Sequence, residues 1–236
     1  MTERQALAQG FAELGLAANP QTVDNFLRFS EMLLETNKVM NLTAVTAPME
    51  VVTRHFLDCA AAMQQLRLTD ESIVDVGCGA GFPGMPTALL YPQAQVTLLD
   101  SLGKRIRFLQ ECITALQLPQ TQAIHARAEE FAAKHREQYD IVTSRAVARM
   151  NVLCELSLPL VKVGGRFAAM KSTNCDAELA EAKKAISVLG GEVECVQDYT
   201  IPLTEMRQRM IIIRKKKETP QKYPRRFQKI AAVPLS

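Results

Sequence analysis

The sequence predicts an α/β protein with a mainly parallel sheet of seven strands, helices on both faces of the sheet, and a helical extension at the N-terminus. Two observations carry this prediction. From about residue 72 onward, short apolar runs typical of strands alternate with longer stretches typical of helices. Such alternation implies parallel strands joined by right-handed crossovers. Before residue 72, apolar residues instead recur at helical spacing.

The N-terminal extension is expected over residues 1–68. A helix is predicted to begin near Asn19 and Pro20, because Asn caps helices well and Pro fits the first turn. Its apolar side follows the i, i+3, i+4, i+7 pattern and consists of Val23, Phe26, Leu27, Ser30, Leu33 and Leu34. A second helical stretch is predicted over residues 49–66.

The sheet domain is expected over residues 69–216, with a basic tail over residues 217–236. The predicted strands lie at residues 72–77, 95–100, 121–126, 139–145, 164–172, 192–202 and 207–215. The predicted helices lie at residues 84–91, 102–118, 128–135, 150–161 and 177–189. In doubly wound sheets, ligands bind at the carboxyl ends of the strands near the point where the strand order reverses. The functional residues are therefore expected at that edge.

Composition excludes several classes of protein. The chain has 236 residues, 47% of them hydrophobic, which is enough to bury a full core. No apolar run approaches the ~18–20 residues of a membrane span, and the charged N-terminus does not resemble a signal peptide. Six cysteines and three histidines are scattered without a CxxC pair, so we expect no metal site, no disulfide framework and a reduced, cytoplasmic location.

Charge is distributed unevenly along the chain. The net charge of +3 divides into +9 for residues 207–229 and −6 for the remainder. A basic stretch on an acidic body is the pattern expected when one surface meets a polyanion. The alternative is a solvated, frayed tail, and charge alone does not decide between the two.

A glycine-rich loop, DVGCGAGFPG at residues 75–84, follows the first predicted strand. Gly77, Gly79 and Gly81 form a GxGxG pattern. Shifted by two residues, the loop also fits the GxGxxG pattern of dinucleotide sites, so glycine spacing alone is a weak signal. Asp75 lies just before the loop, where a carboxylate would oppose a pyrophosphate. The same carboxylate would help to hold the ammonium and sulfonium groups of S-adenosylmethionine.

Further candidates follow the next strands. Asp100 closes the second strand, where its carboxylate can accept hydrogen bonds from ribose hydroxyls of either ligand. Ala128 and Glu129 follow the third strand, where adenine would lie in a methyltransferase of this topology. Asp75, the glycines and Asp100 together favour S-adenosylmethionine over a nicotinamide dinucleotide. The alternatives are a loop cap for Asp75 and a helix N-terminal charge for Glu129.

Arg145 ends the fourth strand beside the expected reversal point and is our candidate catalytic residue. Its guanidinium can order the cofactor or fix the target nucleotide. Alternatively, it pairs with a loop carboxylate such as Asp75. His55 and Asp58 lie three apart on one predicted helix face; they either support the roof of the cofactor pocket or pack together.

Several motifs together resemble one family. They are NLTAV (41–45), RHFLD (54–58), DVGCGAGFPG (75–84), LLDSLGKRIRFL (98–109), ARAEEF (126–131), SRAVA (144–148) and KYPRR (222–226). They resemble the bacterial small-subunit ribosomal RNA guanine-N7 methyltransferases, the glucose-inhibited division protein B family, from about residue 20 to the tail. The resemblance implies a Rossmann-like class I methyltransferase fold and S-adenosyl-L-methionine as cofactor.

The resemblance also implies residue roles. By its motifs, Gly77, Phe82, Ala128, Glu129 and Arg145 would line the cofactor site, with Asp100 in the usual ribose-binding place. Two departures are visible: Cys78 stands where Ser or Thr is common, and KSTN follows the fifth strand in place of the family's KGxx, which weakens any role for Lys171.

The expected chemistry is methyl transfer to N7 of a guanine in 16S rRNA, free or in the small subunit. N7 carries a lone pair, so no proton has to be removed, and in-line placement matters more than acid–base catalysis. Two motifs of other methyltransferases are absent from the sequence, in agreement with this chemistry. It has no Pro-Cys pair, which pyrimidine C5 methyltransferases use for covalent attack. It also has no (D/N/S)PP(Y/F/W) motif, which binds an exocyclic amine, after the fourth strand. Arg225 and Arg226 are expected to contact RNA, and the protein is expected to act as a monomer.

Two other functions stay open at this point. An NAD-dependent oxidoreductase would use GxGxxG and Asp100, but none of the three histidines ends a strand near the glycine loop. A non-catalytic RNA-binding module that has kept a methyltransferase fold is the second alternative.

Overall fold

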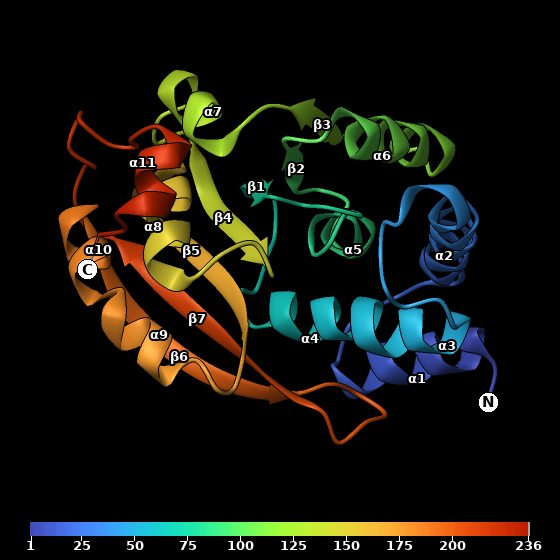
Figure 1. Cartoon of the computed structure of the whole chain (residues 1–236). Helices are drawn as coiled ribbons and strands as arrows, with labels where there is room; N and C mark the ends of the chain where they lie inside the picture. Colours follow the sequence, from blue (N-terminus) through green and yellow to red (C-terminus); the bar gives the residue numbers. More distant parts are fainter. Residues whose placement is uncertain (236) are drawn as a thin grey trace.

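A computed structural model of the protein describes residues 1–235 and contains the predicted seven-stranded sheet (Figure 1). The strand order is β3-β2-β1-β4-β5-β7-β6. The strands are β1 (Ser72–Val76), β2 (Gln95–Asp100), β3 (Thr121–His125), β4 (Tyr139–Arg145), β5 (Val161–Ser172), β6 (Gly191–Thr200) and β7 (Arg207–Lys215). Strands β1 to β5 pair in parallel, and β7 runs antiparallel to both β5 and β6. The order reverses between β1 and β4, as a doubly wound sheet requires.

The helices agree with prediction in place but differ in detail. The α-helices are α1 (Glu3–Glu13), α2 (Pro20–Met40), α3 (Pro48–Val51), α4 (Asp58–Gln64), α5 (Gly84–Leu90), α6 (Gly103–Ala115), α7 (Ala128–Lys134), α8 (Met150–Ser157), α9 (Asp176–Glu181), α10 (Lys183–Val188) and α11 (Phe227–Ala232). A π-helical turn, η1 (Val52–Leu57), joins α3 to α4, and a 3-10 turn, η2 (Leu158–Leu160), follows α8. The predicted helix over 150–161 stops early because Pro159 has no N–H to continue it.

Helix α2 begins where the sequence predicts. The Asn19 side chain accepts a hydrogen bond from the Thr22 N–H at 2.8 Å, and Pro20 occupies the first turn. The helix ends at Asn41, which adopts the left-handed conformation. Its buried side includes Phe26 and Phe29, which continue into an aromatic cluster with residues of η1 and of the glycine loop.

Two hydrophobic clusters cover the two faces of the sheet. Residues of α1 to α6, including Phe11, Phe56 and Phe108, form one cluster with the sheet. Residues of α7, α8, α10 and α11, including Phe131 and Ile230, form the other. The N-terminal helices therefore bury their apolar sides against the sheet domain, and the expected boundary at residue 68 falls in the coil between α4 and β1. No helix within residues 1–235 is long and apolar enough to cross a membrane.

Candidate active site

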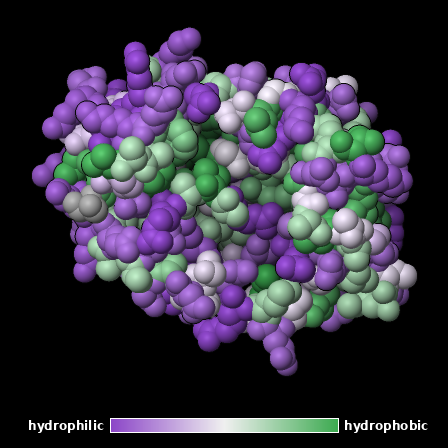
Figure 2. Space-filling view, viewed as in Figure 1, coloured by the Kyte–Doolittle hydropathy of each residue, from purple (hydrophilic) through white to green (hydrophobic). Residues whose placement is uncertain are grey.

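Two cavities lie at the carboxyl edge of the sheet, one on each side of Ala146. The first, here called the Asp100 cavity, measures about 380 Å³ and is lined by the segments that follow β1, β2, β3 and β4. The second, the Arg145 cavity, measures about 410 Å³ and lies between the ends of β4 and β5, the β6–β7 hairpin, and η1. Ala146 lines both cavities and has a positive φ of 57°. Figure 2 shows the hollow in the middle of this face, with both hydrophilic and hydrophobic side chains around it.

Asp100 is held in a fixed orientation at the end of β2. One of its carboxylate oxygens accepts the Gly79 N–H at 2.9 Å, and the other accepts the Leu102 N–H at 2.8 Å. The Arg105 guanidinium lies 3.4 Å from the carboxylate. The oxygen that accepts the Gly79 N–H also accepts from Arg105, whereas the oxygen that accepts the Leu102 N–H can take a second hydrogen bond. Asp100 therefore presents an acceptor position to a ligand without having to move.

The glycine loop allows the segment after β4 to approach closely. Gly77 has a φ of 71°, and a Cβ placed on it would lie 2.6 Å from a methyl group of Val147. A larger residue at position 77 would therefore both strain the backbone and push this segment away. Gly77 and Val147 together form one side of the Asp100 cavity.

The rest of the Asp100 cavity is lined by both apolar and charged residues. Ala128 and Glu129 at the start of α7 line it, together with Leu102 and with Leu156 of α8. Phe227 of α11 completes the lining. The structure thus brings Gly77, Asp100, Ala128 and Glu129 together as the sequence predicts. Phe227 was not anticipated, because the KYPRR segment beside it indicated only charge.

Asp75 and Phe82 line neither cavity. The Asp75 carboxyl is fully buried; one oxygen accepts the Gly84 N–H at 2.8 Å, and the other has no partner within residues 1–235. Burial raises the pKa of Asp75 to about 7. Phe82 packs beneath the Arg145 guanidinium, with 4.9 Å from Cζ to the ring centroid. Cofactor contacts by these two residues stay predictions.

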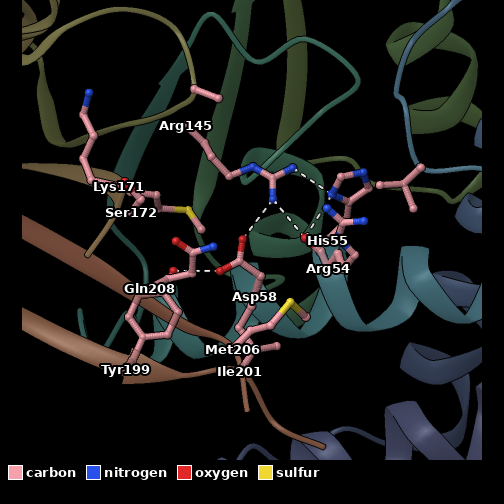
Figure 3. A pocket seen from close by; sticks show the side chains of 13 residues that line it. Arg54, His55, Asp58, Arg145, Lys171, Ser172, Tyr199, Ile201, Met206 and Gln208 are labelled. Carbon is pink, nitrogen blue, oxygen red and sulfur yellow. Dashed lines mark hydrogen bonds and ion pairs between the residues drawn. The ribbon is translucent and has the colours of Figure 1, made fainter. Parts of the chain in front are cut away.

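Arg145 reaches across the hollow from β4 to η1 and α4 (Figure 3). Its side chain is 17% exposed and donates to the Asp58 carboxylate at 3.0 Å. It also donates to Nδ1 of His55 at 3.1 Å and to the Arg54 carbonyl oxygen at 3.4 Å. The alternative that Arg145 pairs with Asp75 was therefore wrong: the partner carboxylate is Asp58, because α4 delivers it to the end of β4 while Asp75 is turned toward Gly84.

The partners of Arg145 are themselves held in place. The second Asp58 oxygen accepts the Tyr199 hydroxyl at 2.8 Å, and burial raises the pKa of Asp58. Nδ1 of His55 lies 3.1 Å from the Arg145 guanidinium and 3.1 Å from the Arg54 carbonyl oxygen, and Nε2 lies 2.8 Å from the Thr43 hydroxyl. Burial and the nearby Arg145 charge lower the pKa of His55 to about 4. His55 is therefore neutral at neutral pH.

The opposite wall of the Arg145 cavity comes from β5 to β7. Tyr199, Met206 and Gln208 line it, and none of them carried a signal in the sequence. Lys171 lines the same wall and binds the Glu178 carboxylate and the Ala148 carbonyl oxygen, the latter at 2.8 Å. Lys171 thus braces the segment after β4.

The two arginines expected to contact RNA have different environments. The Arg225 guanidinium binds the fully buried Glu155 carboxylate of α8, with Nη2 to Oε2 at 2.6 Å. Arg226 is exposed. Lys215, which also belongs to the basic stretch, is fully buried and lies 3.1 Å from Glu137. Part of this positive charge therefore holds the tail to the body of the protein.

Within residues 1–235, no group of three or more His, Cys, Asp or Glu side chains is placed to hold a metal ion.

Comparisons with known proteins agree with this geometry. A family model described as rRNA small subunit methyltransferase G (GidB) matches residues 22–211. The ribosomal RNA small subunit methyltransferase G of Ligilactobacillus salivarius is 47% identical over 235 residues, covering 96% of this chain and 97% of the relative. The protein of the same name from Bacillus subtilis is 44% identical, covering 94% of each chain.

Solved structures match at the level of the fold. TrmN from Thermus thermophilus superimposes with a TM-score of 0.52 at 19% identity, over 70% of this chain and 53% of its own. A precorrin-6y C5,15-methyltransferase from Geobacter metallireducens gives a TM-score of 0.51 at 17% identity, over 66% of this chain and 87% of its own. The fold is thus the Rossmann-like fold of class I methyltransferases.

Proposed function

Because the chain belongs to the rRNA small subunit methyltransferase G family, we propose that it transfers a methyl group from S-adenosyl-L-methionine to N7 of a guanine in 16S rRNA. The observation that carries this proposal is the pair of cavities that meet at Ala146. Both fall within the ~300–1,000 Å³ typical of small-molecule sites. One would hold the methyl donor and the other the accepting base.

The residues of the Asp100 cavity fit the methyl donor. The Asp100 carboxylate supplies an acceptor for a ribose hydroxyl, while Leu102, Ala128 and Leu156 supply an apolar wall for adenine. When bound, S-adenosyl-L-methionine supplies an electrophilic methyl group on a sulfonium. The Asp100 carboxylate, which lines the cavity, would favour the positive charges of this ligand.

The Arg145 cavity suits a guanine taken out of its RNA context. Arg145 has five N–H groups, and the three contacts to Asp58, His55 and Arg54 leave two of them for a ligand. A donor placed on N7 would occupy the lone pair that attacks the methyl group. Arg145 is therefore assigned to O6 or to a phosphate, where it orients the base and leaves N7 free.

The surroundings of Arg145 also suit a reaction without a general base. His55 is neutral, and both of its ring nitrogens are engaged, by Arg145 and by Thr43. N7 attack needs no proton acceptor, so the residues contribute by placing the base in line and by excluding water.

The accepting RNA, or the small subunit that contains it, would meet the exposed cations near this face. Arg226 and Lys229 of the tail are exposed, and Arg54 lines the Arg145 cavity. Contacts with RNA phosphates make binding fall as salt rises. One chain lines both cavities, which supports a monomer, and six free cysteines support a cytoplasmic location.

The test is to incubate the protein with S-adenosylmethionine and small-subunit rRNA lacking 7-methylguanosine, then to analyse the digested nucleosides by mass spectrometry. We expect new 7-methylguanosine, which an Asp100→Ala variant should fail to form because its S-adenosylhomocysteine affinity falls roughly 100-fold. A different methylated nucleoside would keep the donor and overturn the N7 assignment. No product on rRNA or on subunits would overturn the proposed activity.

A further inference from the structure

One lining residue of the Asp100 cavity comes from the C-terminal segment. Phe227, the first residue of α11, is a large apolar side chain that is 38% exposed. It is the single aromatic residue among the residues that the structure places around this cavity. The Arg127 guanidinium lies over its ring, with 5.9 Å from Cζ to the centroid.

Phe227 sits on an anchored helix. Ile230 is fully buried in the hydrophobic cluster with α8, and it lies three residues after Phe227, on the same side of α11. Just before the helix, Arg225 binds the buried Glu155 carboxylate of α8 through its side chain and its backbone N–H. The backbone that carries Phe227 is therefore anchored both before and after this residue in the chain.

Among the other residues that line the cavity, Arg105, Arg127 and Glu129 are charged, and the remaining wall is partly apolar. Leu102, Ala128 and Leu156 offer aliphatic surface and no aromatic face. A planar base that rests on this wall still needs a partner for its other face. A partly exposed aromatic ring supplies that partner, and covering the ring removes apolar surface from water.

We propose that Phe227 is a cofactor-binding residue that packs its ring against the adenine of the methyl donor. This inference rests on the proposed function. It makes the basic C-terminal segment part of the donor site, with Arg226 and Lys229 of the same segment facing solvent. Arg225 then acts as a positioning residue, because it fixes the start of α11.

The test measures S-adenosylhomocysteine binding by titration calorimetry, without RNA. Phe227→Ala should weaken binding about 5- to 20-fold, the effect of losing one base–aromatic contact. Phe227→Tyr keeps the ring and should stay within about twofold of the parent. Val233→Ala is the matched control, because Val233 belongs to the same segment, is 65% exposed and does not line the cavity; it should bind like the parent.

Other outcomes separate the inference from its premise. Equal affinity in Phe227→Ala and the parent overturns the role of Phe227, as does full affinity in Phe227→Leu, which keeps apolar bulk without an aromatic face. The same fold loss is expected with 5′-methylthioadenosine, which lacks the amino-acid part, and a loss seen only with S-adenosylhomocysteine would overturn the adenine contact. If the parent protein binds neither ligand, the proposed function itself fails. Urea unfolding of each variant checks that it is folded.

Discussion

The two cavities at the carboxyl edge of the sheet are similar in size but are built in different ways. The Asp100 cavity is formed mainly by short segments that directly follow β1, β2 and β3, and backbone N–H groups fix its key carboxylate. The Arg145 cavity is formed by segments far apart in the chain: the hydrogen bond between Tyr199 and Asp58 joins residues 141 positions apart. Strand ends thus build most of the first cavity, which Leu156 and Phe227 complete, whereas the second depends on how distant elements pack.

This contrast has an energetic side. In the Asp100 cavity two neutral backbone donors hold the carboxylate, and its ion pair with Arg105 is partly exposed. In the Arg145 cavity a buried guanidinium and a buried carboxylate hold each other, so the loss of either leaves an uncompensated charge. Substitutions in the two cavities should therefore have different effects on the methyl-transfer rate and on cofactor affinity.

The largest effect is expected from Arg145→Ala. Methyl transfer should fall about 100-fold, because the accepting base loses its orientation. S-adenosylhomocysteine affinity should stay within about threefold of the parent, because Arg145 lines the other cavity. Single-turnover rates and calorimetry measure the two quantities. Asp100→Ala should differ from Arg145→Ala in its S-adenosylhomocysteine affinity, which falls roughly 100-fold, and its loss of product follows from that weaker binding.

A parallel loss of rate and of S-adenosylhomocysteine affinity in Arg145→Ala would mean that the two cavities act as one. Folding has to be checked separately, since an unpaired Asp58 costs about 3–5 kcal/mol of stability. The double variant Asp58→Asn, Arg145→Gln removes both charges and serves as the matched control: its stability should recover while its transfer rate stays low.

A smaller effect, on the free energy of unfolding, is expected in the basic tail. Arg225→Ala and Arg226→Ala form a matched pair there. Arg225→Ala leaves the fully buried Glu155 without its partner and should lower the free energy of unfolding by about 2–3 kcal/mol. Arg226 is exposed, so its removal should change that free energy by less than about 0.5 kcal/mol. Urea denaturation measures both.

For RNA binding the order of the two variants should be reversed, with the larger effect in Arg226→Ala. Arg226→Ala should reduce the slope of log affinity against log salt by about 1. If Arg225→Ala leaves stability and S-adenosylhomocysteine affinity unchanged, then Arg225 does not anchor α11.

A pH dependence of stability is also expected from Asp75, whose buried carboxyl interacts electrostatically with Arg145 and Asp100. Its pKa rises from 3.8 to about 7 in the folded protein, chiefly through burial. The native state therefore binds this proton more tightly, and the stability contributed is full below pH 3.8 and lost as the pH rises through 7. The loss amounts to at most about 1.4 kcal/mol per pH unit.

Asp75→Asn should remove this slope, and unfolding free energies at pH 5 and pH 8 measure it. His55 acts in the opposite sense: its pKa falls from 6.5 to about 4, so its contribution is lost as the pH drops through that range. His55 is common to the parent and the variant, so their difference isolates Asp75. A difference that does not change with pH would contradict the buried, protonatable Asp75.

The sequence by itself determined the fold and most of the Asp100 cavity. Alternating strand and helix patterns place strand ends at one edge, and this rule brings Gly77, Asp100 and Ala128 together without knowledge of any distant contact. The capped start of α2 at Asn19 was also predictable, because helix capping depends only on residues that are close in the chain.

Tertiary structure alone decided which charges meet. Arg145 pairs with Asp58 rather than Asp75, and Arg225 pairs with Glu155. The sequence shows only that a charged side chain must be either solvated or paired. Its partner depends on which group the tertiary packing brings close to it. Phe227 reached the Asp100 cavity in the same way, because the anchoring of α11 on α8, and not its own local sequence, set its position.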